Sequence, residues 1–318
     1  MGSGTALSDR VSSRLLPGRA RLAVLENPHA PTVTIAGTLL AGPAWAANGR
    51  FAVPGMVAAM LDRGTTNYSR IELARELEDH GLQLVVRASA STPTLISFSA
   101  QGLAEELPRL VRLLAEVLRR PSFPIGELDK LREQVLGGLV REREETSARA
   151  FAALTRGLFP EGHPLYRRPI EDREREMKSL TRDELADFHA SIYGPATVTF
   201  AVVGDVEAGN VAMLLEDELA GWVGAEVAPL TTDETCSVES LEERIQIADR
   251  PNIDVFLGHR GQLLRGDADY PASVLANSCL GQSTLTSRLG VAVRDGAGLT
   301  YGIYSRFFGT LHIAGPWA

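Results

Sequence analysis

The sequence STLTSRLGVAVRDGAGLTYGIYSR, from Ser283 to Arg306, carries the pattern on which the fold prediction rests. Its apolar residues recur at helical spacing as far as Arg294. The glycines of the following DGAG end the helix, because glycine adopts positive φ without steric cost. The next run, LTYGIYS, is rich in β-branched and aromatic residues that alternate as in a strand. The stretch therefore predicts a helix, a tight turn and a strand, with Arg294 and Tyr301 flanking the turn.

From the residues alone, this pair has both a structural and a functional interpretation. Arg294 is explained equally well as a cation at the C-terminal end of a helix dipole, and Tyr301 as a packing residue of the strand. A nucleotide-binding loop is excluded, because Gly296-x-Gly298 lies between a helix and a strand rather than between a strand and a helix. Both interpretations of the pair stay open at this point.

The same helix, glycine and strand occur earlier in the chain, where Gly81 corresponds to Gly298. Two strands and a helix precede each copy. The expected strands are Arg21–Asn27 and Thr32–Leu40 in the first copy, and Arg244–Asp249 and Ile253–His259 in the second. Such self-similarity indicates an internal duplication. We expect an α+β fold of two duplicated halves, each a mixed and mostly antiparallel sheet covered by helices.

The second copy stops early, so we expect its half to be incomplete and the chain to be a fragment or a truncated reading frame. The predicted domains are residues 1–223, an acidic linker at 224–243, and residues 244–318 as the start of the second half. Residues 1–20 are expected to form a loose arm. The RERE run at 141–144 is expected to be a solvated helix face.

The composition fits a globular protein, with 44% hydrophobic and 23% charged residues among 318. A net charge of −8 argues against nucleic acid as a partner. Cys236 and Cys279 are too few for a disulfide framework. No apolar run reaches the length of a membrane span, and the N-terminus lacks a signal peptide. As written, the chain is expected in the cytoplasm, or in the periplasm or exported if its N-terminus is misassigned.

Several motifs occur in a specific order: the helix LREQVLGGLVRERE, the loop GHPLYRRPI, the strand AVVGD and the stretch SRLGVAVRDGAGLTYGIYS. Together they resemble the insulinase/pitrilysin-type zinc metallopeptidases, a family that includes mitochondrial processing peptidase. The resemblance covers nearly the whole chain. It implies two repeated α+β halves that face each other across a closed chamber.

Active members of that family carry H-x-x-E-H on the helix just before a Gly-Thr pair, with a more distant glutamate as the third zinc ligand. The resemblance places Gly55, Ala58 and Ala59 where His, Glu and His belong, and Gly137 and Gly138 in the region of the third ligand. The six histidines lie too far apart in sequence to rebuild the motif, and each is expected to be a surface or capping residue: His29, His80, His163, His189, His259 and His312. We therefore expect no metal and no cofactor in this chain.

The family also carries an Arg and a Tyr, seven residues apart, that hold the substrate carbonyl, and Arg294 and Tyr301 match that pair. A guanidinium and a phenol are suitable donors for the oxyanion formed during peptide hydrolysis. The resemblance thus implies a non-catalytic, substrate-binding subunit of a heterodimeric zinc peptidase. Its partners would be a peptide and a catalytic H-x-x-E-H subunit that holds the zinc, so this chain alone would be inactive. The alternative is a purely structural member, like the core proteins of respiratory complexes.

Overall fold

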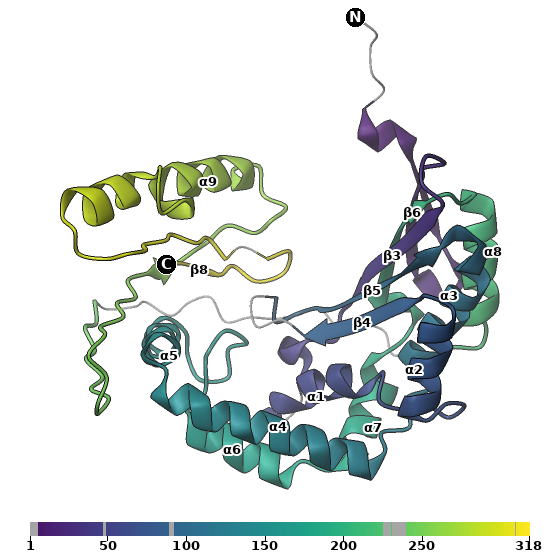
Figure 1. Ribbon diagram of the computed structural model, residues 1–318, viewed down its shortest axis with the longest axis horizontal. Coiled ribbons are helices and arrows are strands. Elements are labelled where there is room, and N and C mark those ends of the chain that lie inside the picture. The colour runs from purple at the N-terminus through teal and green to yellow at the C-terminus, as the bar shows by residue number, and fades with distance from the viewer. Residues whose placement is uncertain (1–5, 47–48, 89–91, 225–229, 231–239, 309) are drawn as a thin grey trace, which may run out of the picture. The chain divides into compact units, whose positions relative to one another are not determined.

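The computed structural model describes residues 6–46, 49–88, 92–224, 230, 240–308 and 310–318 of the chain (Figure 1). The chain forms two compact units that do not follow its order. Unit 1 consists of Met1–Leu136 and Glu174–Pro229, and unit 2 of Gly137–Arg173 and Leu230–Ala318.

Unit 1 contains a six-stranded sheet with the strand order β1-β2-β6-β3-β5-β4. The strands are β1 Val11–Leu15, β2 Arg21–Glu26, β3 Thr32–Leu39, β4 Gln83–Ala88, β5 Ile96–Leu103 and β6 Val198–Gly204. Only β2 and β6 run parallel; all other neighbours are antiparallel. The mixed, mostly antiparallel sheet expected from the sequence is confirmed for this unit. The expectation that residues 1–20 form a loose arm is wrong for β1, because Val11–Leu15 pairs in continuous register with β2.

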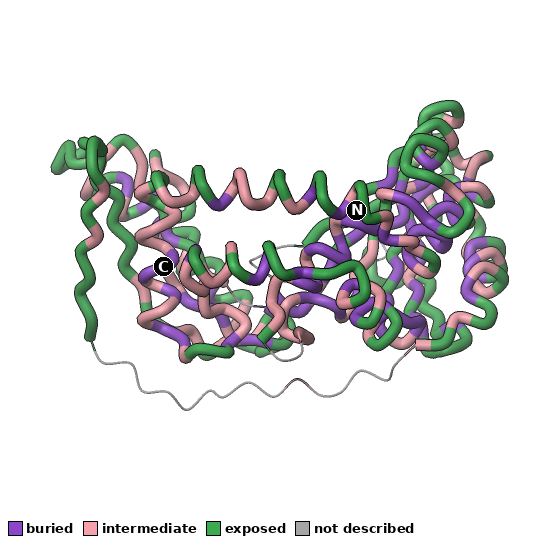
Figure 2. Tube along the Cα trace, turned by 90° about the horizontal axis from the view of Figure 1, so that it is seen from below, coloured by how far each residue is buried: buried purple, intermediate pink, exposed green. Residues whose placement is uncertain are grey.

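Helices cover one face of this sheet, and the side chains of the strands alternate accordingly. In β6, Val198, Phe200 and Val202 are buried while the residues between them are exposed. The buried face packs against α1 Ala52–Met60, α3 Leu107–Arg119 and α8 Ala208–Leu219, and Figure 1 shows α3 and α8 alongside the strands. The buried segments, purple in Figure 2, are concentrated in the unit that contains the sheet. A helix-covered sheet of this size supplies unit 1 with its hydrophobic core.

Two further helices of unit 1 begin with capping boxes, in which a Ser or Thr is followed three residues later by Glu. Ser69 caps α2 (Arg70–Asp79) with Glu72, and Thr181 caps α7 (Arg182–Ile192) with Glu184. In each box the hydroxyl accepts from a backbone N–H and the glutamate accepts from the capping residue's own N–H. These helix starts are therefore fixed by local sequence alone.

Two helices run through both units. The long helix α4 (Ile125–Glu144) leaves unit 1 after Leu136, and α6 (Ile170–Ser179) enters it at Glu174. Between them lies α5 (Thr146–Leu158) in unit 2. Within the described residues, no helix is long and apolar enough to cross a bilayer.

The interpretation of residues 141–144 as a solvated face is wrong for Glu142. Only 12% of its side chain is exposed, and it accepts hydrogen bonds from Arg167 at 2.9 Å and from Arg173 at 2.7 Å. Burial raises the pKa of the Glu142 carboxyl, but the bonds from Arg173 and Arg167 outweigh this and leave the pKa below its ordinary value. One face of residues 141–144 is therefore held by the two arginines that bond to Glu142, instead of facing solvent.

The second half departs most from expectation. Unit 2 has a short helix α9 (Tyr270–Asn277), two π-helical segments at Ser278–Gln282 and Gly290–Gly296, and a two-residue strand pair of β7 (His259–Arg260) with β8 (Pro316–Trp317). Gly298 has a φ of 64°, close to the 61° of Gly81, so the two glycines do match. The linker prediction falls mostly on residues outside the described ranges, and the domain boundaries stay a prediction.

The strands expected at 244–249, at 253–259 and after Gly298 are wrong, apart from the first residue of β7. The alternation that suggested them is present, but among the described residues no neighbouring strand pairs with the main chain there. Ile253, Val255 and Leu257 are each more than 80% exposed. Period-two hydrophobicity predicts a strand only where a partner supplies the ladder hydrogen bonds. The internal duplication is therefore not confirmed and stays a prediction.

Candidate functional site

The three positions that the resemblance assigns to the zinc motif lie on α1. Ala58 is 1% exposed and belongs to the core of unit 1. Gly55 and Ala59 are partly exposed on the same helix. A Cβ at Gly55 would meet no heavy atom within 4 Å. Gly55 thus lies open at the helix surface, Ala59 packs in part against the core, and Ala58 is buried within it.

These residues do not fit a zinc ion. Hydrogen and methyl side chains offer no lone pair, and zinc in proteins requires N, O or S ligands. Across the described part of the chain, no three His, Cys, Asp or Glu side chains lie close enough together to hold a metal ion. No catalytic step is therefore assigned to α1.

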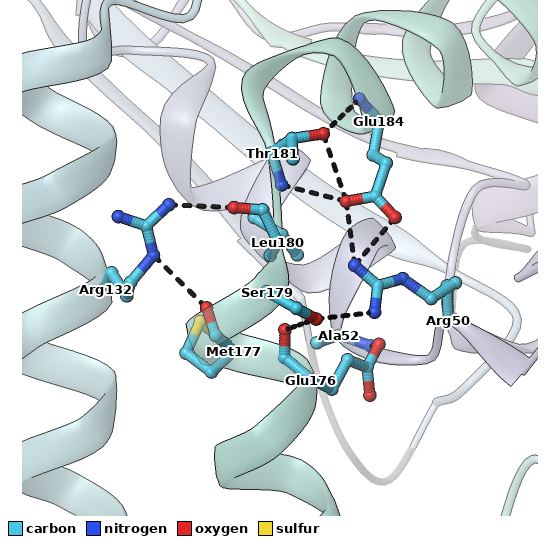
Figure 3. Close-up of polar contacts among 9 residues, drawn as sticks. All are labelled: Arg50, Ala52, Arg132, Glu176, Met177, Ser179, Leu180, Thr181 and Glu184. Atoms are coloured by element: carbon cyan, nitrogen blue, oxygen red, sulfur yellow. Dashed lines mark hydrogen bonds and ion pairs between the residues drawn. The ribbon is translucent and has the colours of Figure 1, made fainter.

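The start of α1 is nevertheless held by a defined set of polar contacts (Figure 3). The backbone N–H of Ala52 donates to Glu176 Oε1 at 2.8 Å, which ties the first turn of α1 to α6. Arg50 donates to Ser179 Oγ at 3.0 Å and to Glu184 at 2.7 Å. These contacts satisfy a backbone donor that the helix itself leaves unpaired. We call Arg50, Glu176, Ser179 and Glu184 the α1 clamp.

Electrostatics strengthen the clamp at Glu184, which also completes the capping box of Thr181. Partial burial raises the pKa of the Glu184 carboxyl, but the hydrogen bonds from Arg50 and the Thr181 backbone outweigh it, so the net pKa is lowered. The carboxylate therefore stays ionised at neutral pH and holds both groups.

Helix α4 is fixed to the same region by Arg132. Its Nε donates to the carbonyl of Met177 at 3.2 Å and its Nη2 to the carbonyl of Leu180 at 2.8 Å (Figure 3). These are carbonyls at the C-terminal end of α6, which its own backbone leaves without partners. Further along α4, Gly137 and Gly138 add no ligand atom, and a Cβ on either would meet nothing closer than Arg141 Nη2 at 4.0 Å from Gly138.

The structure brings the second candidate set, Arg294 and Tyr301, together within unit 2. Arg294 Nε donates to the backbone carbonyl of Tyr301 at 3.1 Å. Its guanidinium carbon lies 5.8 Å from the centroid of the Tyr301 ring, and Nη1 pairs with Asp295 Oδ1 at 2.8 Å. Tyr301 is 91% exposed. The contact runs through the main chain across the Gly298 turn, and it leaves the tyrosine ring open to a ligand.

Arg294 offers a guanidinium and Tyr301 a phenolic hydroxyl. Both are hydrogen-bond donors suited to a carbonyl or carboxylate oxygen. The aromatic ring facing the cation also limits the freedom of the arginine. Their role in substrate binding stays a prediction.

The expectation that each histidine is a surface or capping residue is wrong for His163, which is 7% exposed. His189 is also buried, but its Nε2 bonds to the carbonyl of Leu118 at 2.9 Å and so caps the C-terminal end of α3. His163 Nδ1 accepts from the Leu165 N–H at 3.1 Å, and its ring stacks on Phe159. Burial, followed by the nearby Arg260 charge, lowers the pKa of His163 to about 4. The flanking Pro164 was a signal for a tight turn that could have placed this ring inside.

Two family models match the chain. The model described as "Insulinase (Peptidase family M16)" matches residues 53–163, and "Peptidase M16 inactive domain" matches residues 179–317. The chain belongs to peptidase family M16. Its resemblance to the insulinase-type family is thereby confirmed, and a match to the inactive-domain model over its C-terminal part is consistent with a non-catalytic member.

The individual relatives include uncharacterized zinc proteases, cytochrome b-c1 complex subunits and a protein of Helicobacter pylori named as a non-peptidase homolog. An uncharacterized zinc protease of Mycobacterium tuberculosis is 25% identical over 252 residues, which are 77% of this chain and 55% of the relative. Subunit 1 of the mitochondrial cytochrome b-c1 complex of Bos taurus is 24% identical over 201 residues, 63% of this chain and 40% of the relative. The M16 chain thus spans about half the length, or less, of these curated relatives.

Solved structures show the fold. A crystal structure of a peptidase M16 inactive domain from Pseudomonas fluorescens superposes with a TM-score of 0.80 at 24% identity, covering 96% of this chain and 73% of that one. The architecture of the M16 chain is therefore that of this family.

Proposed function

We propose that the M16 chain is a non-catalytic, substrate-binding subunit of a heterodimeric M16 peptidase. The partner, a chain with an intact H-x-x-E-H motif, would hold the zinc and activate the water. This chain would bind the peptide and present Arg294 and Tyr301 to the oxyanion at the partner's zinc. Alone it would bind no zinc and cleave no peptide.

The observation that carries this proposal is the contrast between the two candidate sets. The α1 positions hold only Gly55, Ala58 and Ala59, although the α1 clamp that orients the helix is intact. Arg294 and Tyr301, in contrast, contact each other across the Gly298 turn, and the tyrosine is 91% exposed. A fully exposed aromatic ring gains little from packing, so exposure favours a contact with another molecule.

The decisive experiment compares two tyrosines of the same segment. The M16 chain is reconstituted with an H-x-x-E-H chain of the same family from the same organism, and kcat is measured on a quenched peptide. Tyr301→Phe should slow turnover by roughly 10²–10³-fold, the usual cost of removing one oxyanion donor. Tyr304→Phe is the matched control, because Tyr304 is 61% exposed three residues away and has no assigned role.

Arg294→Lys should also lower kcat on the quenched peptide, since an ammonium cannot reproduce the forked, planar guanidinium. Sedimentation velocity on each mixture checks that the variants still assemble with the partner. Wild-type kcat for Tyr301→Phe at unchanged assembly removes this chain from the chemical step. Metal analysis of the isolated chain is a separate test, and one tightly bound zinc per chain would contradict the proposed absence of a metal site.

A structural role is the second candidate, and the similarity to cytochrome b-c1 subunit 1 favours it. In that case the chain would assemble stably with a partner whose activity, if any, is unaffected by both Tyr301→Phe and Arg294→Lys. The same experiment therefore separates the two roles.

A further inference from the structure

We propose that Gly137 and Gly138 form a hinge inside helix α4, at which unit 2 bends relative to unit 1. The boundary between the two compact units lies between Leu136 and Gly137, in the interior of a helix of 20 residues. The inference concerns motion and stands apart from the proposed peptide binding.

On its N-terminal side, α4 is attached to unit 1. Leu128 and Leu131 are buried at 2% and 7% exposure in the core of that unit. Arg132 adds two hydrogen bonds to the carbonyls of Met177 and Leu180, which also belong to unit 1. This half of the helix therefore moves with the sheet.

On its C-terminal side, α4 is attached to unit 2. Glu142 accepts hydrogen bonds from Arg167 and Arg173, and Glu144 pairs with Arg250 at 2.8 Å. All of these residues belong to unit 2. The buried Glu142 cluster is the stronger attachment, because breaking one partner would leave a buried charge uncompensated.

The two glycines lie between these attachments. Glycine is the least favourable helix residue after proline, because its backbone loses the most freedom on ordering. Sharp bends in helices occur at prolines, at glycine or serine pairs and at inserted groups. No packing requires a glycine here, since a Cβ at Gly137 would meet nothing within 4 Å and one at Gly138 only Arg141 Nη2 at 4.0 Å. The pair therefore weakens the helix where the attachments change.

The return connection has to open as well. Helix α6 changes unit between Arg173 and Glu174, within its first turn, which begins at Ile170. Only the first four residues of α6 therefore move with unit 2, and bending there opens the first turn of that helix. The third connection, near 229–230, borders residues outside the described ranges.

Hydrogen exchange at residue level tests the weakness of the helix. In the wild type, amides of residues 138–142 should exchange faster than those of 129–133. Each Gly→Ala replacement should slow exchange of residues 138–142 roughly fivefold, the helix-propensity difference between the two residues. Gly126→Ala is the control, because Gly126 lies in the first turn of the same helix and a Cβ there also meets nothing within 4 Å. It should leave residues 138–142 unchanged.

Electron-electron double resonance tests the motion itself. Spin labels are placed at Met213 on α8 and Leu275 on α9, which are 55% and 68% exposed, after Cys236 and Cys279 are replaced by serine. The distance distribution should narrow in Gly137→Ala/Gly138→Ala and not in Gly126→Ala. If the double variant aggregates, each single variant is measured, and each should narrow the distribution part of the way.

Equal widths in the wild type and the alanine variants would overturn the hinge, even if exchange were slower. Equal exchange rates at residues 138–142 would overturn it as well, because the helix would then not be weakened at the glycines.

Discussion

A glutamate at position 58, which the resemblance assigns to the general base of the zinc motif, should destabilise unit 1. Ala58 is 1% exposed and packs in the core, so the side chain of Ala58→Glu would be forced among apolar groups. Overpacking costs about 1–3 kcal/mol, and an unpaired buried carboxyl adds several more if it ionises. We expect a loss of at least about 3 kcal/mol near pH 7.

The pH dependence gives this prediction a sign. Burial would raise the folded-state pKa of the new carboxyl above its unfolded value of about 4.3. Below that pH the carboxyl is neutral in both states and only the packing cost remains. As the pH rises towards the folded-state pKa, the unfolded chain ionises first, so the destabilisation must grow with pH.

Urea unfolding followed by tryptophan fluorescence measures the effect. In a Trp317→Phe background, only Trp45 and Trp222 remain, and both lie in unit 1. Gly55→Glu is the matched control, because it places the same charge on an open position of the same helix. A stability of Ala58→Glu within about 0.5 kcal/mol of the wild type, the range of ordinary surface changes, would refute the described packing of α1.

Three further predictions concern stability. Gly55→Ala should stabilise unit 1 by about 0.5–1 kcal/mol in urea unfolding, because glycine is unfavourable inside a helix and the added Cβ has room. A less stable variant would contradict the open space described around the Cβ at position 55. The depressed pKa of His163 means that the unfolded chain binds its proton first as the pH falls from 6.5 to about 4, so stability is lost in that window. Urea unfolding should show that the free energy of unfolding falls by about 1–2 kcal/mol over this window, after solvent screening. His163→Gln should abolish this loss, whereas His29→Gln, at an exposed site, should not. Glu142→Gln should cost about 2 kcal/mol in thermal unfolding by leaving two arginines without a carboxylate, whereas Glu144→Gln, at a side chain 68% exposed, should be nearly neutral.

Local signals predicted most of unit 1. The capping boxes at Ser69 and Thr181 and the alternation of β6 depend on residues a few positions apart, so the sequence contains them directly. The strand β1 was missed because Val11–Leu15 is mostly exposed and lacks a hydrophobic period. Its strand character comes from pairing with β2, which is a tertiary property.

The residue types at the candidate site could be predicted from the sequence, whereas the burial and the contacts of those residues could not. Gly55 and Ala58 could be placed on α1 by counting back from Gly64, but the burial of Ala58 was not foreseen. The α1 clamp joins Arg50 to Glu184 across 134 positions, and no short motif signals such a pair. Glu142 was misjudged for the same reason, since its partners lie 25 and 31 residues away.

The place of β6 in the sheet has a consequence for biosynthesis. β6 lies between β2 and β3, yet it follows β3 by more than 150 residues of chain. At the usual rates of translation, β2 and β3 leave the ribosome roughly 10–30 s before the strand that joins them. During that interval their facing edges have no ladder partner, and unpaired edges recruit strands from other chains. The nascent chain is therefore most prone to aggregation before residue 204 is made, and a ribosome-associated chaperone acting in this interval should raise the yield of folded protein.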